Sequence, residues 1–473
     1  MSTAKTIFIA LPFVAFAFAE AWTAEPIHFV KRSWDDASKK VVETDTAITE
    51  YTVLSGNFEK KKDTVKADTW YVVKGTVTRL SVFAPPGASG NLVICDGATL
   101  KGQIAINEGS TLNIYGQEHD SGKIQAESVE LVTAPENLGG AMESPVDGTV
   151  SLAAIGGGWD GGNMGTLVIH GGSIIARSEK PLNAEFVAGI GEGRNGNGGS
   201  VTIYGGTVKA YGGKDASGIG SAEQLNGVKH GGTLTVYGGT VEAHGGKHGA
   251  GIGGGQDASG SKVTIYGGTV KAYGGTDAAG IGSGEKFAPG PSINGGSLTV
   301  YGGDVFADGT GWGAGIGGGE DSDGADVKIY GGKVVAWAGA DAGKKNGSAI
   351  GSEDGNGHYG KLYIADGLRV WAGQSAESTS LFPYETRVPA CRWRPYARIE
   401  PDPRVQQVNT DAGNILKKSA ASNDIRVQEG RLDAVHSIGR HADLWFDLQG
   451  RKLNGRPADQ GKYLHNGKVE VVR

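Results

Sequence analysis

Residues 201–220 read VTIYGGTVKAYGGKDASGIG, and this arrangement decides the fold because the chain repeats it. In each copy a β-alternating phrase, a Gly-Gly pair and a second β phrase precede a Gly-Ile-Gly element. Seven copies of the first phrase lie 34, 33, 29, 35, 29 and 35 residues apart, starting at Leu167, Val201, Leu234, Val263, Leu298, Val327 and Leu362. Short β units of this period cannot bury a core alone, so the repeat predicts stacked coils rather than a globule.

Apolar and polar residues alternate within each phrase, as in Val201, Thr202, Ile203 and Tyr204. This period of two predicts strands whose apolar side chains point inward. Each Gly-Gly pair predicts a corner, and the Gly-Ile-Gly element predicts a third short strand. Three strands and three corners per repeat predict an all-β chain in which each repeat forms one coil of a parallel β-helix. Glycine supplies 83 of 473 residues, but no Gly-X-Y period runs through them, which excludes collagen.

The N-terminus predicts export. Lys5 precedes a short apolar run, IFIALPFVAFAFA, and an Ala-Phe-Ala pattern ends at Ala19. These features are typical of a secretory signal peptide, and the run is too short to span a bilayer. No other segment is long and apolar enough, so we expect a secreted or surface-displayed protein that is not an integral membrane protein. The net charge of −6, without a basic block in the repeats, argues against a nucleic-acid partner.

The domain boundaries are placed where the glycine-rich repeats begin and end. Trp34, Trp70 and Tyr71 precede the first coils, and a polar, irregular stretch follows Pro401. Cys95 and Cys391 fall in opposite end regions of the predicted solenoid, so we favour free thiols over a disulfide. The predicted parts are a signal peptide (1–19), an N-terminal cap region (20–90), parallel β-helix repeats (91–374), a C-terminal cap (375–400), a linker (401–440) and a small C-terminal β element (441–473).

Several phrases together resemble a known family. Four phrases resemble exported bacterial repeat proteins described as carbohydrate-binding-domain-containing or surface proteins: WYVVKGTVTRLSVFA, LVICDGATLKGQIAINEGSTLNIYGQ, the repeated AGIGGG, and repeats of the type GGSVTIYGGTVKA. The resemblance covers about residues 25–400. It implies a right-handed β-helix of the pectate-lyase-like type. Separately, FDLQGRKLNGRP and GKYLHNGKVEVV resemble the C-terminal tail of secreted bacterial proteins, a short type IX sorting element.

A column of rings is the main candidate for a binding site. The residue before each Gly-Gly pair lies on the outward-facing phase of its strand, and equivalent residues of stacked coils form ladders. Aromatic rings in register can form a platform for sugar rings, but they can instead cover the corners and stabilise the stacking of coils. The column holds His170, Tyr204, Tyr237, Tyr266, Tyr301 and Tyr330.

Further aromatic residues are candidates for the same function. A second, mixed column holds Arg177, Tyr211, His244, Tyr273, Asp308 and Trp337. Trp159 and Trp312 lie in Gly-rich loops, where an exposed indole is costly unless it contacts something.

Carboxylates after Gly-Ile-Gly suggest a cation site. The coils alternate between a Glu type and an Asp type, and such loops can hold calcium between coils because hard cations take several oxygen ligands. Solvated turn residues are the simpler interpretation. The candidates are Glu223, Glu285 and Glu353 of the first type and Asp160, Asp257 and Asp321 of the second.

A catalytic site should occur once in the chain, but no set of potentially catalytic residues occurs once among the repeated sequences. We therefore expect a non-catalytic β-helix protein that binds extracellular polysaccharide or a cell-surface glycan, or acts as an adhesin, with no required cofactor and calcium as an option. One alternative is a polysaccharide lyase or hydrolase whose site is assembled across coils. Another is a purely structural surface spacer.

Overall fold

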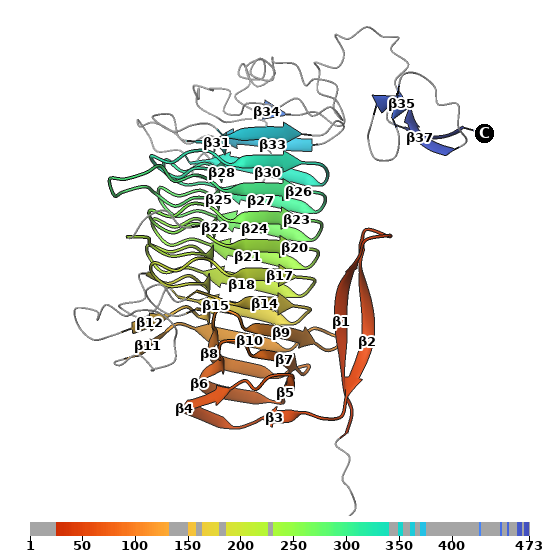
Figure 1. Cartoon of the computed structure of the whole chain (residues 1–473), viewed down its shortest axis with the longest axis vertical. Helices are drawn as coiled ribbons and strands as arrows, with labels where there is room; N and C mark the ends of the chain where they lie inside the picture. The colour runs from red at the N-terminus through yellow and green to blue at the C-terminus, as the bar shows by residue number, and fades with distance from the viewer. Residues whose placement is uncertain are drawn as a thin grey trace, which may run out of the picture.

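The structure is a computed structural model in which the chain forms one elongated stack of coils (Figure 1). It contains strands and no α-helix in its described part, and in that part no helix is long and apolar enough to cross a membrane. The described residues are 25–131, 150–157, 163–178, 186–225, 230–339, 349–352, 360–364 and 369–374, with the short strands at 425–426, 445–446, 452–453, 461–465 and 468–472.

One side of the stack is an eleven-stranded parallel sheet, the first sheet. Its strands pair without register shifts, so that Val201 faces Leu234 and Tyr-bearing strand ends align from coil to coil. In order they are β3 (Thr52–Leu54), β5 (Thr69–Val73), β7 (Ser89–Ile94), β9 (Thr111–Gly116), β14 (Thr166–Ile169), β17 (Ser200–Ile203), β20 (Thr233–Val236), β23 (Lys262–Ile265), β26 (Ser297–Val300), β29 (Asp326–Ile329) and β32 (Lys361–Ile364).

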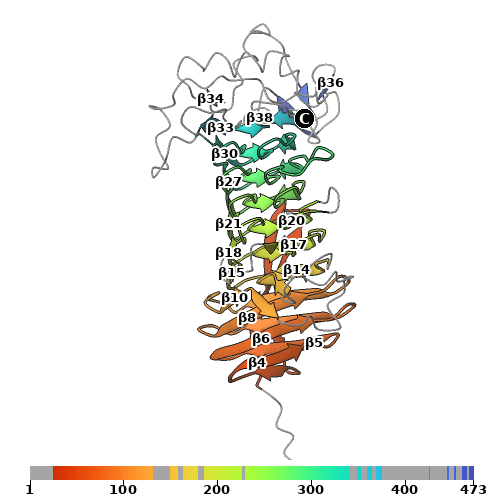
Figure 2. The same ribbon diagram turned by 90° about the vertical axis from the view of Figure 1, so that its left-hand side faces the viewer.

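The second side begins after each Gly-Gly corner. Its strands are β4 (Asn57–Thr64), β6 (Thr76–Ala84), β8 (Thr99–Ile106), β10 (Lys123–Glu127), β15 (Ser173–Arg177), β18 (Thr207–Tyr211), β21 (Thr240–His244), β24 (Thr269–Tyr273), β27 (Asp304–Asp308), β30 (Lys333–Ala338) and β33 (Arg369–Gln374). The long strands β4, β6 and β8 give the first coils a broader outline (Figure 2). Strand β8 pairs with β10 through Leu100 and with β13 through Ile104, so it serves two sides at once.

The Gly-Ile-Gly elements form the third side, as the sequence predicts. They are β13 (Ile155–Gly156), β16 (Ile190–Gly191), β19 (Ile219–Gly220), β22 (Ile252–Gly253), β25 (Ile281–Gly282), β28 (Ile316–Gly317) and β31 (Ile350–Gly351). Each isoleucine is at most 8% exposed and joins one continuous apolar core with the inward residues of the other two sides. The fold is therefore the expected all-β parallel β-helix with three short strands per coil.

Two glycine positions in every full coil allow this close stacking. The second glycine of each Gly-Gly corner has a positive φ, such as 80° at Gly206 and 81° at Gly239. The glycine after each core isoleucine also has a positive φ, for example 140° at Gly253, and a Cβ there would collide with the carbonyl oxygen of Gly282 in the next coil. Side chains are thus excluded by the conformation and by the distance between coils.

The N-terminal region differs from a simple end cap. Parallel stacking begins at β3, so coils already occupy much of the stretch that the sequence analysis placed in the cap region. Strands β1 (Ile27–Asp35) and β2 (Lys40–Ile48) form an antiparallel hairpin, the N-terminal hairpin. This hairpin runs along the flank of the stack rather than across its end (Figure 1).

The remaining strands are short. Strands β11 (Val129–Leu131) and β12 (Val150–Leu152) pair antiparallel, and β34 (Ile425–Arg426) pairs with β33. Strands β35 (Trp445–Phe446), β36 (Lys452–Leu453), β37 (Gly461–His465) and β38 (Lys468–Val472) form a separate four-stranded sheet, which is a small C-terminal β element. The proposed signal peptide at 1–19, the cap at 375–400 and most of the linker at 401–440 lie outside the described residues.

The third-side glycines give a direct test of the stacking. We expect Gly253→Ala to lower the free energy of unfolding by about 3 kcal/mol or more, because it combines an unfavourable φ with a collision against the next coil. Gly290→Ala is the matched control, since Gly290 has a φ of 152° but no atom within 4 Å of the added Cβ. Denaturant unfolding of both variants measures the difference, and equal losses would contradict the collision.

Candidate functional site

The column of rings forms a stacked ladder on the first sheet, in the register that the sequence predicts. Successive ring centroids are 4.7–5.3 Å apart and neighbouring planes are within 12° of parallel from His170 to Tyr330. Tyr115 extends the ladder by one ring, at 4.4 Å from His170. The phrase Asn113-Ile114-Tyr115-Gly116 resembles the repeat and is the signal that could have included this residue.

Stacking limits what the ladder can offer to a ligand. Each internal ring has another ring against both faces, and the terminal rings are also covered, Tyr115 by Phe29 and Tyr330 by the tilted ring of Tyr363. Sugar rings bind aromatic residues through exposed ring faces, so the expected face-on platform is not the geometry that these rings present. The ladder instead presents ring edges and hydroxyl groups along the coil axis.

The N-terminal hairpin covers most of the ladder. Phe29 packs on Trp70 and Tyr115 at its base, with centroid distances of 4.9 and 4.8 Å. Near its tip, the Trp34 ring lies 5.0 Å from the rings of both Tyr237 and Tyr266. The hairpin therefore follows the ladder from Tyr115 to Tyr266.

A buried polar contact fixes the middle of the hairpin. The Arg32 guanidinium donates a 2.6 Å hydrogen bond to the carbonyl oxygen of His170 and pairs with Glu43 and Asp120 at 2.7 and 2.9 Å. His170 Nδ1 in turn lies 2.6 Å from the carbonyl oxygen of Arg32. Burial lowers the pKa of His170 to about 4, so the ring is neutral at pH 7 and its Nδ1–H donates this bond.

The ladder is most exposed beyond the rings that Trp34 contacts. Tyr301 is 48% exposed, the largest exposure among the ladder rings. In the described part of the chain, the hydroxyls of Tyr237, Tyr266 and Tyr301 make no hydrogen bond to protein groups. Tyr301 and Tyr330 are the ladder rings beyond those that Trp34 contacts, and Tyr363 borders them at the other end. We call this section the open ladder.

The second column is also in register, but its residue types are more mixed. Arg177 lies over the Tyr211 ring at 4.1 Å, and His244 stacks between Tyr211 and Tyr273 at 4.8 and 4.6 Å. The regular stack stops there because the next residue of the column is Asp308. Trp337 is only 3% exposed, which favours packing over ligand contact for this candidate.

Asp308 is an unusual member of this column. It faces Tyr273 and Trp337 in the neighbouring strands, and Phe306 from its own strand contacts both of those rings. Its Oδ1 atom is buried and has no hydrogen-bond partner among the described residues. Burial raises the pKa of Asp308 to about 7 because the carboxylate is poorly solvated among aromatic rings.

The carboxylates that follow Gly-Ile-Gly occupy two columns rather than one. Asp257 and Asp321 lie five residues after the core isoleucine and have positive φ values of 57° and 53°. The Asp257 carboxylate accepts hydrogen bonds from the backbone N–H groups of Phe287 and Ala288 at 2.9 and 2.8 Å. Such bonds stabilise the turn of the next coil.

Glu223 and Glu285 belong to the other column, four residues after the isoleucine. Burial raises the pKa of both carboxyls, and the opposing charges of Arg194 and His248 reduce the shift of Glu223 and Glu285 respectively. Arg194 Nε lies 3.0 Å from a Glu223 oxygen. The two glutamates are therefore partly desolvated, and each has two basic neighbours, Arg194 and Lys214 for Glu223 and His248 and Lys247 for Glu285.

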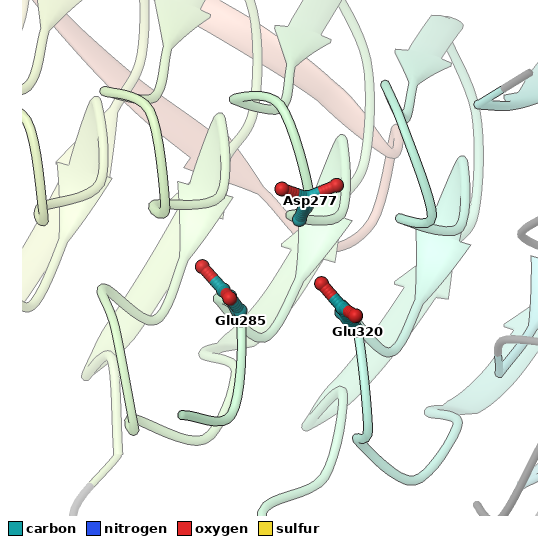
Figure 3. A group of neighbouring side chains, drawn as sticks. All are labelled: Asp277, Glu285 and Glu320. Carbon is teal, nitrogen blue, oxygen red and sulfur yellow. The ribbon is translucent and has the colours of Figure 1, made fainter. Parts of the chain in front are cut away.

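Asp277, in the loop before the core isoleucine, lies close to glutamates that follow such isoleucines. We call this acidic group the carboxylate cluster. Asp277, Glu285 and Glu320 come from two successive coils, and their oxygen ligand atoms lie within 4.8 Å of one another (Figure 3). His248 bridges toward the preceding coil, with Nδ1 at 2.7 Å from Asp215 and Nε2 at 3.5 Å from Glu285. Three carboxylates in such an arrangement can hold a hard cation.

The sequence analysis identified only Glu285 of this cluster. Asp215, His248, Asp277 and Trp312 all stand four residues before their core isoleucines, while Glu285 and Glu320 stand four residues after theirs. This symmetric spacing was the missed signal. Trp159, Asp160 and Glu353 lie outside the described residues.

The Asp308 carboxyl predicts a pH dependence of stability. Its pKa is higher in the folded state than in the unfolded state, so its contribution to stability is fully present below pH 4 and is lost as pH rises to about 7. Asp308→Asn should therefore stabilise the protein by about 1–3 kcal/mol at pH 8 and leave the stability at pH 4 almost unchanged.

Chemical unfolding at both pH values measures this effect. Asp304→Asn is the matched control, because Asp304 starts the same strand but is exposed. A gain that is independent of pH, or an equal gain in the control, would contradict the account.

Comparisons with known proteins agree with the fold. Residues 201–223, 234–256 and 263–285 match a protein-family model described as a beta helix repeat. No curated protein and no solved structure matched the chain. The matched segments include the ladder residues Tyr204, Tyr237 and Tyr266 and the carboxylates Glu223 and Glu285. These three segments thus match a beta helix repeat, in agreement with the parallel β-helix of the described residues.

Proposed function

We propose that the protein is secreted or displayed on the cell surface and binds an extracellular polysaccharide without cleaving it. The observation that carries this proposal is the open ladder, where Tyr301 is the most exposed ladder ring and Tyr330 follows it at the repeat distance of the coils. If the bound glycan belongs to another cell, the same binding would make the protein an adhesin.

The chemistry of the open ladder suits a sugar polymer. A phenol hydroxyl both donates and accepts hydrogen bonds, as sugar hydroxyls do. Ring edges beside it offer apolar surface for sugar C–H groups. The Tyr301 and Tyr330 centroids are 5.3 Å apart, close to the length of one sugar unit in an extended chain. Thr299 lies two residues before Tyr301 on the same outward face and adds a polar group.

Binding at this section would be weak per site and would gain from repetition. Each neutral hydrogen bond contributes only about 0.5–1.5 kcal/mol. A polymer that contacts several protein molecules on a surface gains avidity without any new contact. We therefore expect retention on insoluble or long-chain glycans more readily than binding of single sugars.

Hydroxyl recognition can be tested without disturbing the stack. Tyr301→Phe with Tyr330→Phe keeps both rings and removes two hydroxyls, and we expect roughly tenfold weaker binding to the polysaccharide with an unchanged melting temperature. The control pair is Tyr237→Phe with Tyr266→Phe, whose rings lie under Trp34. Affinity gel electrophoresis or a glycan pull-down measures the effect. Equal losses in both pairs, or none in the first, would contradict recognition at the open ladder.

The carboxylate cluster favours a second candidate function. Asp277, Glu285 and Glu320 with His248 combine clustered acids, a raised Glu285 pKa and a basic residue across three coils. A lyase or hydrolase site assembled across coils would need such groups, because general acid catalysis depends on a carboxyl with a raised pKa. In this second candidate function, the three carboxylates would also hold a calcium ion.

Calcium and cleavage can be measured together. At ten times its Kd, calcium should stabilise the native protein by about 1.4 kcal/mol relative to chelator. Glu285→Gln with Glu320→Gln should abolish this gain, whereas Glu118→Gln, an exposed residue outside the cluster, should keep it. A thermal shift that is the same with calcium and with chelator would contradict a calcium site. Release of new reducing ends or unsaturated products from a glycan would replace the binding proposal by the enzymatic one.

A further inference from the structure

The charged residues beside the open ladder indicate which kind of polysaccharide would bind there. This inference rests on the polysaccharide binding proposed above. The outward residue two positions before each ladder ring is Thr202, Thr235, Thr264 or Thr299 in four successive coils. In the next coil the same column holds Lys328, which is exposed. The repeat is therefore broken by a cation at the coil that carries Tyr330.

Lys328 faces no acidic residue in register. Its partners in the neighbouring strands are Thr299 and Tyr363. The acidic residues nearby on these strands face other cations instead: Asp326 faces Lys361, and Asp304 faces Lys333 across the adjoining corner. The ammonium group of Lys328 is thus not matched by a carboxylate across its own strands.

The hairpin tip brings Asp36 close to Tyr237 and Tyr266, and Lys39 close to Tyr266. Its Asp36 carboxylate is paired with Lys39 at 3.0 Å. Trp34 and the tip residues lie over Tyr237 and Tyr266, on the far side of Tyr301 from Lys328. Along the coil axis, a polymer on the open ladder would therefore meet Trp34, then Tyr301, and then Tyr330 with Lys328 beside it in the same coil.

We infer that the polysaccharide is anionic, with a carboxylate or sulfate group bound by Lys328 while its hydroxyls contact Tyr301 and Tyr330. Outward residues two apart on a strand are separated by about 7 Å. The flexible lysine side chain can span that distance to reach a charged group on a sugar that lies along the ladder. The neutral threonines of the other coils offer no such contact, so the preference is specific to the open ladder.

Lys328→Thr restores the residue of the other coils and is the direct test. Lys262→Ser is the matched control, because Lys262 is an exposed lysine on the same face, lies between Thr233 and Ser297, and is two positions farther from the ring column. The ligands are a polyuronate and its methyl ester, and a sulfated polysaccharide and its desulfated form. Affinities are measured by affinity gel electrophoresis at low and at 0.5 M salt, with melting temperatures as a fold control.

We expect the wild type to prefer one charged polymer over its neutral counterpart, which also identifies the anion. Lys328→Thr should weaken binding of that polymer roughly two- to fivefold, and salt should remove the difference. Lys262→Ser should bind like the wild type. Equal affinities for charged and neutral forms, or equal losses in both variants, would overturn this inference while leaving polysaccharide binding in place. Failure of all four polymers to bind would overturn the proposed function itself.

Discussion

Backbone hydrogen bonding between successive coils is the constraint on which the other features depend. The core isoleucines show it most simply: Ile219 N, Ile252 N and Ile281 N each donate to a glycine carbonyl of the next coil, at 3.1, 3.0 and 2.9 Å. These bonds require the backbones to lie close together, and glycines at positive φ allow that approach. Once the coils are so fixed, every position of one coil lies over the same position of the next. Side-chain columns, including the ring ladder and the carboxylates, follow from this register.

The same register that builds the ladder also limits its chemistry. Rings at the coil spacing cover the faces of their neighbours, so stacking and face-on sugar binding exclude each other at the internal positions. The N-terminal hairpin reduces the accessible part further by placing Trp34 on Tyr237 and Tyr266. Most of the ladder therefore stabilises the solenoid, and the recognition that we propose would use the hydroxyls of Tyr301 and Tyr330. Lys328, where the threonine column is interrupted, supplies the cation in the proposed contact.

The parts of the structure that repeat could be predicted from the sequence, because period-two alternation and Gly-Gly corners fix which residues point outward. The ring column from His170 to Tyr330 and the mixed column through Asp308 were both found in this way. The hairpin contacts could not be predicted, since nothing in the residues around Trp34 specifies docking more than 200 positions away. The carboxylate cluster was found only in part, because Asp277 from the same coil and Glu320 from the next coil approach Glu285 through loops whose paths depend on tertiary packing.

The central claim is that a polysaccharide contacts the open ladder and nothing under the hairpin. NMR of protein with ¹³C-labelled tyrosine rings, titrated with a bound polymer, tests it most directly. Our account predicts chemical-shift changes at Tyr301 and Tyr330, with Tyr204 and Tyr237 unchanged. Shifts at Tyr211 and Tyr273 without any at Tyr301 would contradict it, as would shifts spread evenly along the whole ladder.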